Sequence, residues 1–179
     1  MSADLLERAV GYALGALRSV PPAALGLPTP CRGWPLRVLV AHVDDALLAL
    51  HEAADLGRVR LEPPEDPADP VSAARERARL VLGAWSRPSR ASVSVAGTDL
   101  AADLLTTAGA VEVAVHGWDV ARALGRDHPL PAALAAELLE LSPALVTDVD
   151  RPSRFAPPIP LPRGAPPGDR LLAFLGREP

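Results

Sequence analysis

The stretch PLRVLVAHVDDALLAL, residues 35–50, has the apolar spacing of a helix that buries one face. Its apolar positions recur three and four residues apart, which places them on one stripe: Leu36, Leu39, Val40, Val43 and Leu47. Pro35 suits the first turn of such a helix, where its missing N–H has no cost. We therefore predict a helix over 35–55, with His42 beside the packed stripe.

Comparable periodicity elsewhere predicts further helices. They span 3–19, 71–85, 100–124 and the stretch within 129–146, and a short helix closes the chain. The alternating stretch RASVSVAG, residues 90–97, predicts a short strand or hairpin arm. Residues 60–70 form an acidic, proline-rich loop, and 154–179 begin as a proline-rich arm. The predicted fold class is all-α: one domain over 1–179, an up-and-down four-helix bundle with extra short helices and that arm.

Bulk composition limits the classes of partner. The chain has 179 residues, 49% of them hydrophobic, and a formal net charge of -4, so it can bury a core but will not attract nucleic acid or an anionic membrane by charge. A single cysteine fits a reducing cytoplasm, and we see neither a signal peptide nor a transmembrane run. We expect a cytoplasmic protein, monomer or homodimer, that acts on a small molecule without nucleic-acid or membrane partners.

Polar groups interrupt the second strongly apolar stretch, EVAVHGWDVA, residues 112–121. Glu112 and His116 are four apart, so a helix stacks them on one face. A carboxylate near a core is costly unless it is paired or ligated. His42 from the facing helix would complete a set of three metal ligands, the number found in catalytic sites. Imidazole plus carboxylate suits a divalent ion, zinc first, with nickel, iron and manganese as alternatives; a plain surface Glu–His pair is the other interpretation.

Two residues that follow this pair are candidates for a catalytic role. Asp119 is three after His116 and would accept a hydrogen bond from its imidazole. Arg122 is three after Asp119, and a surface ion pair between these two is the alternative.

Trp34 and Arg37 are the candidate cofactor-binding residues, at the start of the 35–55 helix. Trp34, like Trp118, would wall a pocket or simply fill core. Arg37, like Arg32, would receive an anionic substrate or remain solvated. We interpret Cys31 as a packing residue in preference to a thiolate ligand or nucleophile. His51 and His128 are expected to lie at a helix end and in a loop, without partners.

Three stretches resemble a known family. TPCRGWPLRVLVAHV, residues 29–43, resembles the Thr-Pro-Cys-x-Gly-Trp approach to the second helix in the mycothiol-dependent maleylpyruvate isomerase N-terminal family, whose members are DinB-like metal-binding bundles. EVAVHGWDVARALG, residues 112–125, looks like the second metal motif of that family. Residues 154–179 resemble the closing segment of a short actinobacterial branch described only as metal-binding.

The resemblance implies a DinB-like bundle whose metal is held by His42, Glu112 and His116. It also implies mycothiol as a cosubstrate in those members that are enzymes. The isomerase carries a further C-terminal domain that contributes to its active site, and this chain is too short to hold it. We therefore do not expect maleylpyruvate isomerisation itself.

The leading hypothesis is a mycothiol-linked transferase or isomerase that acts on a small electrophile through a metal-bound thiolate. A hydrolase or lyase that uses metal-bound water is the second hypothesis. A non-catalytic metal-binding or regulatory protein is the third.

Overall fold

The computed structural model describes residues 2–60, 67–85, 90–151 and 154–179, so most of the predicted loop 60–70 lies outside the described residues. Two compact units divide the chain, Met1–His128 and Pro129–Pro179. Among the described residues, none of the helices is long and apolar enough to cross a membrane.

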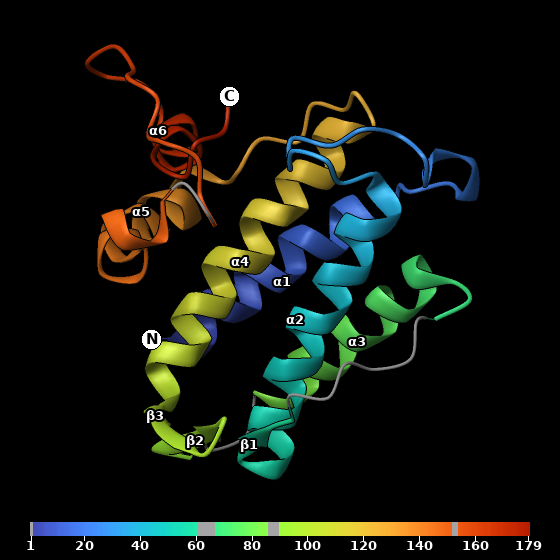
Figure 1. Cartoon of the computed structure of the whole chain (residues 1–179), viewed down its shortest axis with the longest axis vertical. Coiled ribbons are helices and arrows are strands. Elements are labelled where there is room, and N and C mark those ends of the chain that lie inside the picture. The colour runs from blue at the N-terminus through green and yellow to red at the C-terminus, as the bar shows by residue number, and fades with distance from the viewer. Residues whose placement is uncertain (1, 61–66, 86–89, 152–153) are drawn as a thin grey trace. The chain divides into compact units, whose positions relative to one another are not determined.

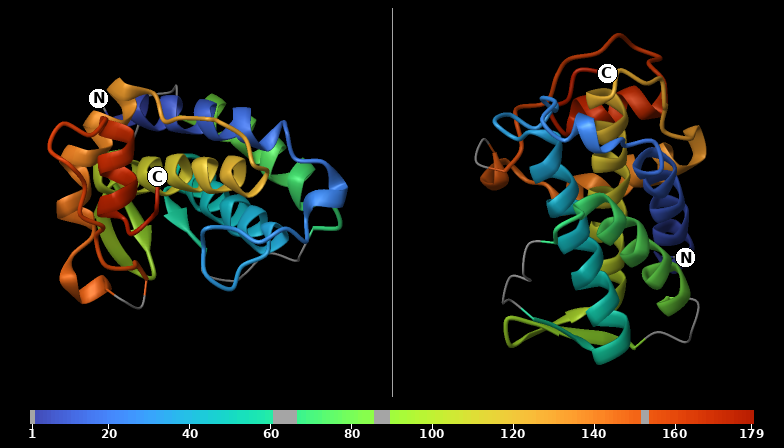
Figure 2. Two further views of the ribbon diagram at one scale, coloured as in Figure 1. Left: turned by 90° about the horizontal axis from the view of Figure 1, so that it is seen from above. Right: turned by 90° about the vertical axis from the view of Figure 1, so that its right-hand side faces the viewer.

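In the part of the first unit that the structure describes, four helices form the framework: α1 (Ser2–Leu17), α2 (Leu36–Leu56), α3 (Pro70–Ala84) and α4 (Ala102–Ala123). Helix α4 packs against α1 and α2, and α3 packs against the same two helices from the other side (Figures 1 and 2). The four therefore close into a bundle, and the all-α, DinB-like fold class is confirmed. A 3-10 turn, η1 (Pro22–Ala24), follows α1.

The apolar stripe that predicts α2 is the part of that helix which enters the core. Its five residues are each at most 1% exposed. Gly57 caps the C-terminus of α2, and its φ of 69° is the left-handed conformation that favours glycine. Asp69 caps the N-terminus of α3, because its side chain accepts hydrogen bonds from the backbone N–H groups of Val71 and Ser72.

A small three-stranded sheet adds to the helices of this unit. Strand β1 (Arg58–Val59) pairs in parallel with β2 (Ser92–Val95), which pairs antiparallel with β3 (Thr98–Ala101). The turn between β2 and β3 consists of Ala96 and Gly97, both at positive φ, as a two-residue hairpin turn requires. The predicted strand or hairpin arm is thus a hairpin. Because β3 takes residues 98–101, α4 begins two residues later than the periodicity predicts.

Helices α1 and α4 approach each other closely at Gly117. A Cβ on this glycine would lie 2.8 Å from the Cα of Ala13, closer than real Cβ contacts allow. The neighbouring residue on α4 is His116, so this close approach fixes the part of the helix that carries the imidazole.

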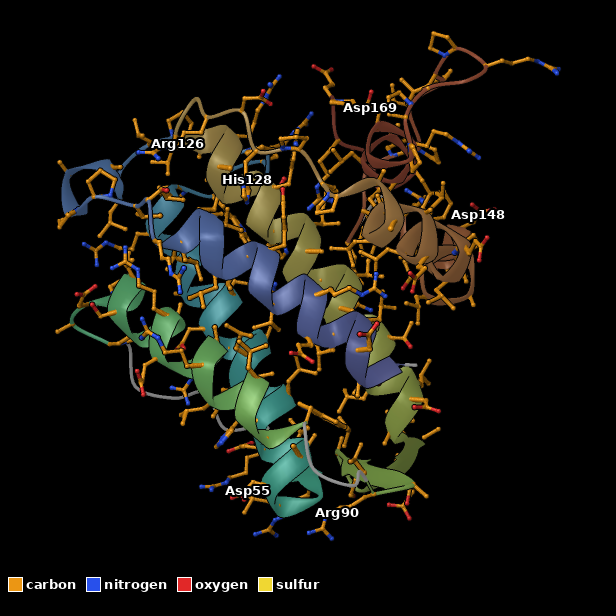
Figure 3. All side chains as sticks on the ribbon, turned by 180° about the vertical axis from the view of Figure 1, so that it is seen from behind. Asp55, Arg90, Arg126, His128, Asp148 and Asp169 are labelled. Carbon is orange, nitrogen blue, oxygen red and sulfur yellow. The ribbon has the colours of Figure 1, made fainter. Side chains whose placement is uncertain are left out.

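The prediction that His128 lacks partners is wrong. Its ring stacks on that of Tyr12 with the centroids 4.4 Å apart, and the Tyr12 hydroxyl donates to the His128 carbonyl at 2.6 Å. Burial raises the pKa of Tyr12 well above its ordinary value, and the charge of Asp119 adds to the effect. The segment after α4 therefore folds back onto α1, a contact between residues 116 apart that no local pattern reveals (Figure 3).

The second unit contains α5 (Ala132–Leu145), a 3-10 turn η2 (Asp148–Asp150) and α6 (Pro167–Phe174), with α5 packed on α6. Its proline-rich arm is tied to α6. The N–H of Ile159 donates to the Ala173 carbonyl at 2.9 Å, and the Arg151 guanidinium donates to the Phe174 carbonyl at 2.8 Å. A proline-rich arm closed by a short helix is therefore present.

Candidate metal centre

His42 of α2 and the pair Glu112 and His116 of α4 converge on one point of the bundle. The Oε1 atom of Glu112 lies 2.5 Å from Nε2 of His42 and 3.1 Å from Nε2 of His116. The two imidazole rings are perpendicular, with centroids 5.0 Å apart. One donor atom from each residue lies within 4.8 Å of the other two, so the side chains that the sequence singles out do meet.

The cluster is buried on one side and open on the other. The His116 side chain is 8% exposed, whereas those of His42 and Glu112 are 36% and 34% exposed. His42 and Glu112 therefore form the solvent-facing side of the cluster, and His116 lies in the packed interior.

The electrostatics of the cluster favour a positive charge at its centre. Burial by itself would raise the pKa of Glu112, but hydrogen bonds from His116 and His42 outweigh it and hold that pKa far below its usual range. Burial would lower the pKa of His116, yet hydrogen bonds with Asp119, Cys31 and Glu112 raise it well above the ordinary value. Two imidazoles and a carboxylate with this preference suit a divalent cation, which would take the place of the shared protons.

Asp119 lies behind His116, as the spacing predicts. Its carboxylate is 0% exposed, and its Oδ2 is 2.9 Å from Nδ1 of His116. An ionised carboxylate only accepts hydrogen bonds, so Nδ1 must carry the proton. The other ring nitrogen, Nε2, then faces Glu112 and His42.

The remaining predicted site residues lie at different depths. Trp34 flanks the cluster, its ring centroid 5.0 Å from that of His42 and edge-on to it. Trp118 is buried, and the exposed Arg122 places its guanidinium carbon 5.7 Å from the Trp118 ring. Arg37 is exposed at the start of α2. Of these four, Trp34 is the one that the structure brings to the cluster.

The contact of Cys31 is the feature that sequence reasoning missed. Its Sγ lies 3.3 Å from Oδ2 of Asp119 and 3.8 Å from Nδ1 of His116. The thiol is half-buried and joins a polar network, whereas packing is the interpretation that the sequence favours for Cys31. No local signal could reveal this contact, because 88 positions separate Cys31 from Asp119.

An all-α bundle in which two central helices join two histidines and a glutamate at a solvent-facing cluster defines a DinB-like protein with a candidate metal centre. Residues 6–121 match the family model described as the mycothiol maleylpyruvate isomerase N-terminal domain, and the chain belongs to this family. The match begins within α1, stops two residues before the last residue of α4, and contains every residue of the cluster.

Two uncharacterized proteins from two strains of Mycobacterium tuberculosis are similar to this chain over almost their whole length. Each is 32% identical over 178 residues, which cover 96% of this chain and 94% of the relative. No solved structure matches the chain significantly.

Proposed function

We propose that the chain binds a divalent metal ion, zinc first, through His42, Glu112 and His116, and that it is a mycothiol-linked transferase or isomerase of small electrophiles. Nickel, iron and manganese are the alternative ions. The observation that carries the proposal is the convergence of two imidazole nitrogens and one carboxylate oxygen within 4.8 Å. Membership of the mycothiol-related family supports the thiol cosubstrate.

The bound metal would supply positive charge that lowers the pKa of a thiol from its free value of about 8.5, so that the thiol reacts as thiolate near neutral pH. The residues of the chain then have separate tasks. His42 and Glu112 border the solvent-facing side, where a small molecule can enter. Trp34 limits the volume beside His42, and Asp119 fixes the orientation of His116.

Two arginines that the sequence singled out would interact with the substrate and not with the metal. Arg37 lies on the surface at the start of α2, where it offers a cation to an anionic substrate. Arg122 is held against Trp118 and would act on an anionic substrate group. Arg37 and Arg122 both remain candidate site residues because of their positive charge.

A water-based reaction is the second candidate function. The exposure of His42 and Glu112 admits water as readily as it admits a thiol. A hydrolase or lyase would need no mycothiol, so thiol binding separates this candidate from the first.

Calorimetric titration of mycothiol into metal-loaded and metal-free protein tests the leading proposal. Binding should be strong with metal, weak without it, and accompanied by release of about one proton, because the thiol is mostly protonated below its pKa of about 8.5. Buffers of different ionisation heat count the proton. Equal binding with and without metal would contradict the thiol mechanism. Metal binding without mycothiol binding would favour the water-based reaction or a non-catalytic metal-binding role.

Asp119→Asn should weaken metal affinity about 10- to 100-fold, the usual effect of losing the hydrogen-bond partner of a ligand. The amide can present its NH₂ group to Nδ1 of His116 and so favours the wrong imidazole tautomer. Competition with a chromogenic chelator measures the affinity. Asp127→Asn is the matched control, because Asp127 is exposed in the segment after α4. Equal metal affinities in the two variants would show that Asp119 does not support the metal centre.

A further inference from the structure

The loop before α2 carries a thiol to the buried side of the cluster. Cys31 comes from residues 29–35, and its Sγ donates to Oδ2 of Asp119 at 3.3 Å. The same oxygen accepts from Nδ1 of His116 at 2.9 Å. The thiol and the imidazole therefore share one acceptor atom, which belongs to a carboxylate with no exposed surface.

This loop is built so that the thiol keeps its place. The Thr29 hydroxyl donates to the Trp34 carbonyl at 2.8 Å and accepts from the Cys31 N–H at 3.2 Å. A backbone bridge joins Pro28 to Pro35, and the N–H of Leu36 donates to the Leu27 carbonyl at 2.8 Å. One short turn thus fixes Trp34 in front of the cluster and Cys31 behind it.

The position of the sulfur argues against a direct role for it in the His42, Glu112 and His116 set. Cys31 lies on the Nδ1 side of the His116 ring, whereas Glu112 lies on the Nε2 side. The two ring nitrogens point in different directions, so an ion on Nε2 is out of reach of a sulfur beside Nδ1. The sulfur therefore faces the carboxylate that orients the ligand.

We propose that Cys31 is a positioning residue of the metal centre. Its S–H holds Oδ2 of Asp119 where that atom accepts the Nδ1 proton of His116, so that Nε2 faces Glu112 and His42. A buried carboxylate with two donors on one oxygen has less freedom to rotate than one with a single donor, and the imidazole is held correspondingly well. The inference rests on the proposed metal site.

The test compares Cys31→Ala, which removes the donor, with Cys31→Ser, which keeps a hydroxyl donor. Cys31→Ala should weaken zinc affinity about tenfold, and Cys31→Ser should remain within about threefold of the unmodified protein, since a thiol is the weaker donor of the two. Arg32→Ala is the control for disturbance of the loop, because Arg32 is exposed. The visible spectrum of the cobalt-loaded protein reports ligand geometry: Cys31→Ala should alter it and Cys31→Ser should not.

A measurement without metal separates this inference from the proposed function. Nitrogen-15 NMR of the His116 ring in metal-free protein reports the Nδ1 hydrogen bond, which Cys31→Ala should perturb and Cys31→Ser should keep. If the unmodified protein binds no zinc, the proposed function fails, and the NMR comparison decides the role of Cys31. Unchanged ring signals in Cys31→Ala, or equal losses of affinity in the alanine and serine variants, would overturn the positioning role.

Discussion

Replacing His42, Glu112 or His116 with alanine, one at a time, should reduce bound metal to less than about a tenth of that in the unmodified protein. The reason is the ligand count: three protein groups are the usual minimum for a tight site of this type, and two leave the ion mostly hydrated. Elemental analysis after dialysis against a weak chelator measures the metal content. Circular dichroism checks that the bundle is retained.

His51→Ala provides the matched control for these substitutions. His51 lies on the same helix, α2, nine positions after His42 and therefore about 13 Å further along the helix axis. The His51→Ala variant loses an imidazole, as the ligand variants do, but leaves the cluster unchanged. Its metal content should therefore equal that of the unmodified protein. Full metal occupancy in all three ligand variants would show that the ion binds elsewhere.

The cluster could be predicted in part from the sequence because the geometry of a helix is local. Glu112 and His116 are four residues apart, and any helix there places them on one face. The contribution of His42 depends on the register between α2 and α4, which periodicity alone does not determine. Its position beside the apolar stripe and the family resemblance together indicated it, and the structure places its Nε2 2.5 Å from Glu112.

Contacts between distant segments are the part that the sequence could not supply. Cys31 meets Asp119, and Tyr12 stacks on His128, through the way the loops fold back on the bundle. The sequence does not indicate that α1 and α4 approach closely at Gly117, because a glycine in a helix is equally compatible with an open surface. Such contacts follow from packing of the whole unit and not from any local pattern.

Asp44 of α2 is a buried carboxylate that is not among the residues singled out from the sequence. It lies four residues after Val40 and three before Leu47, so the stripe itself places this carboxylate toward the core. In the structure Asp44 is buried, with 3% of its surface exposed. What the spacing could not tell is which arginine of α3 would meet it. That residue is Arg77, whose Nε lies 2.8 Å from Oδ1 of Asp44.

Arg77→Ala should lower the free energy of unfolding by about 3 kcal/mol, because it leaves the buried Asp44 carboxylate without this partner. The Arg77 side chain is 25% exposed, so water will replace part of the lost interaction, and the value is set at the lower end of the range for broken buried pairs. Urea unfolding followed by circular dichroism measures the loss.

The neighbouring pair on the same helix is the control for this last prediction. Arg79 contacts Glu76 at 3.2 Å, but both side chains are more than half exposed, so Arg79→Ala should change stability by less than about 0.5 kcal/mol. The double variant Asp44→Leu/Arg77→Met should recover most of the stability lost in Arg77→Ala, because an apolar pair removes the buried charge altogether. Equal effects of Arg77→Ala and Arg79→Ala would mean that water solvates Asp44 in the variant, and that the ion pair does not hold α2 against α3.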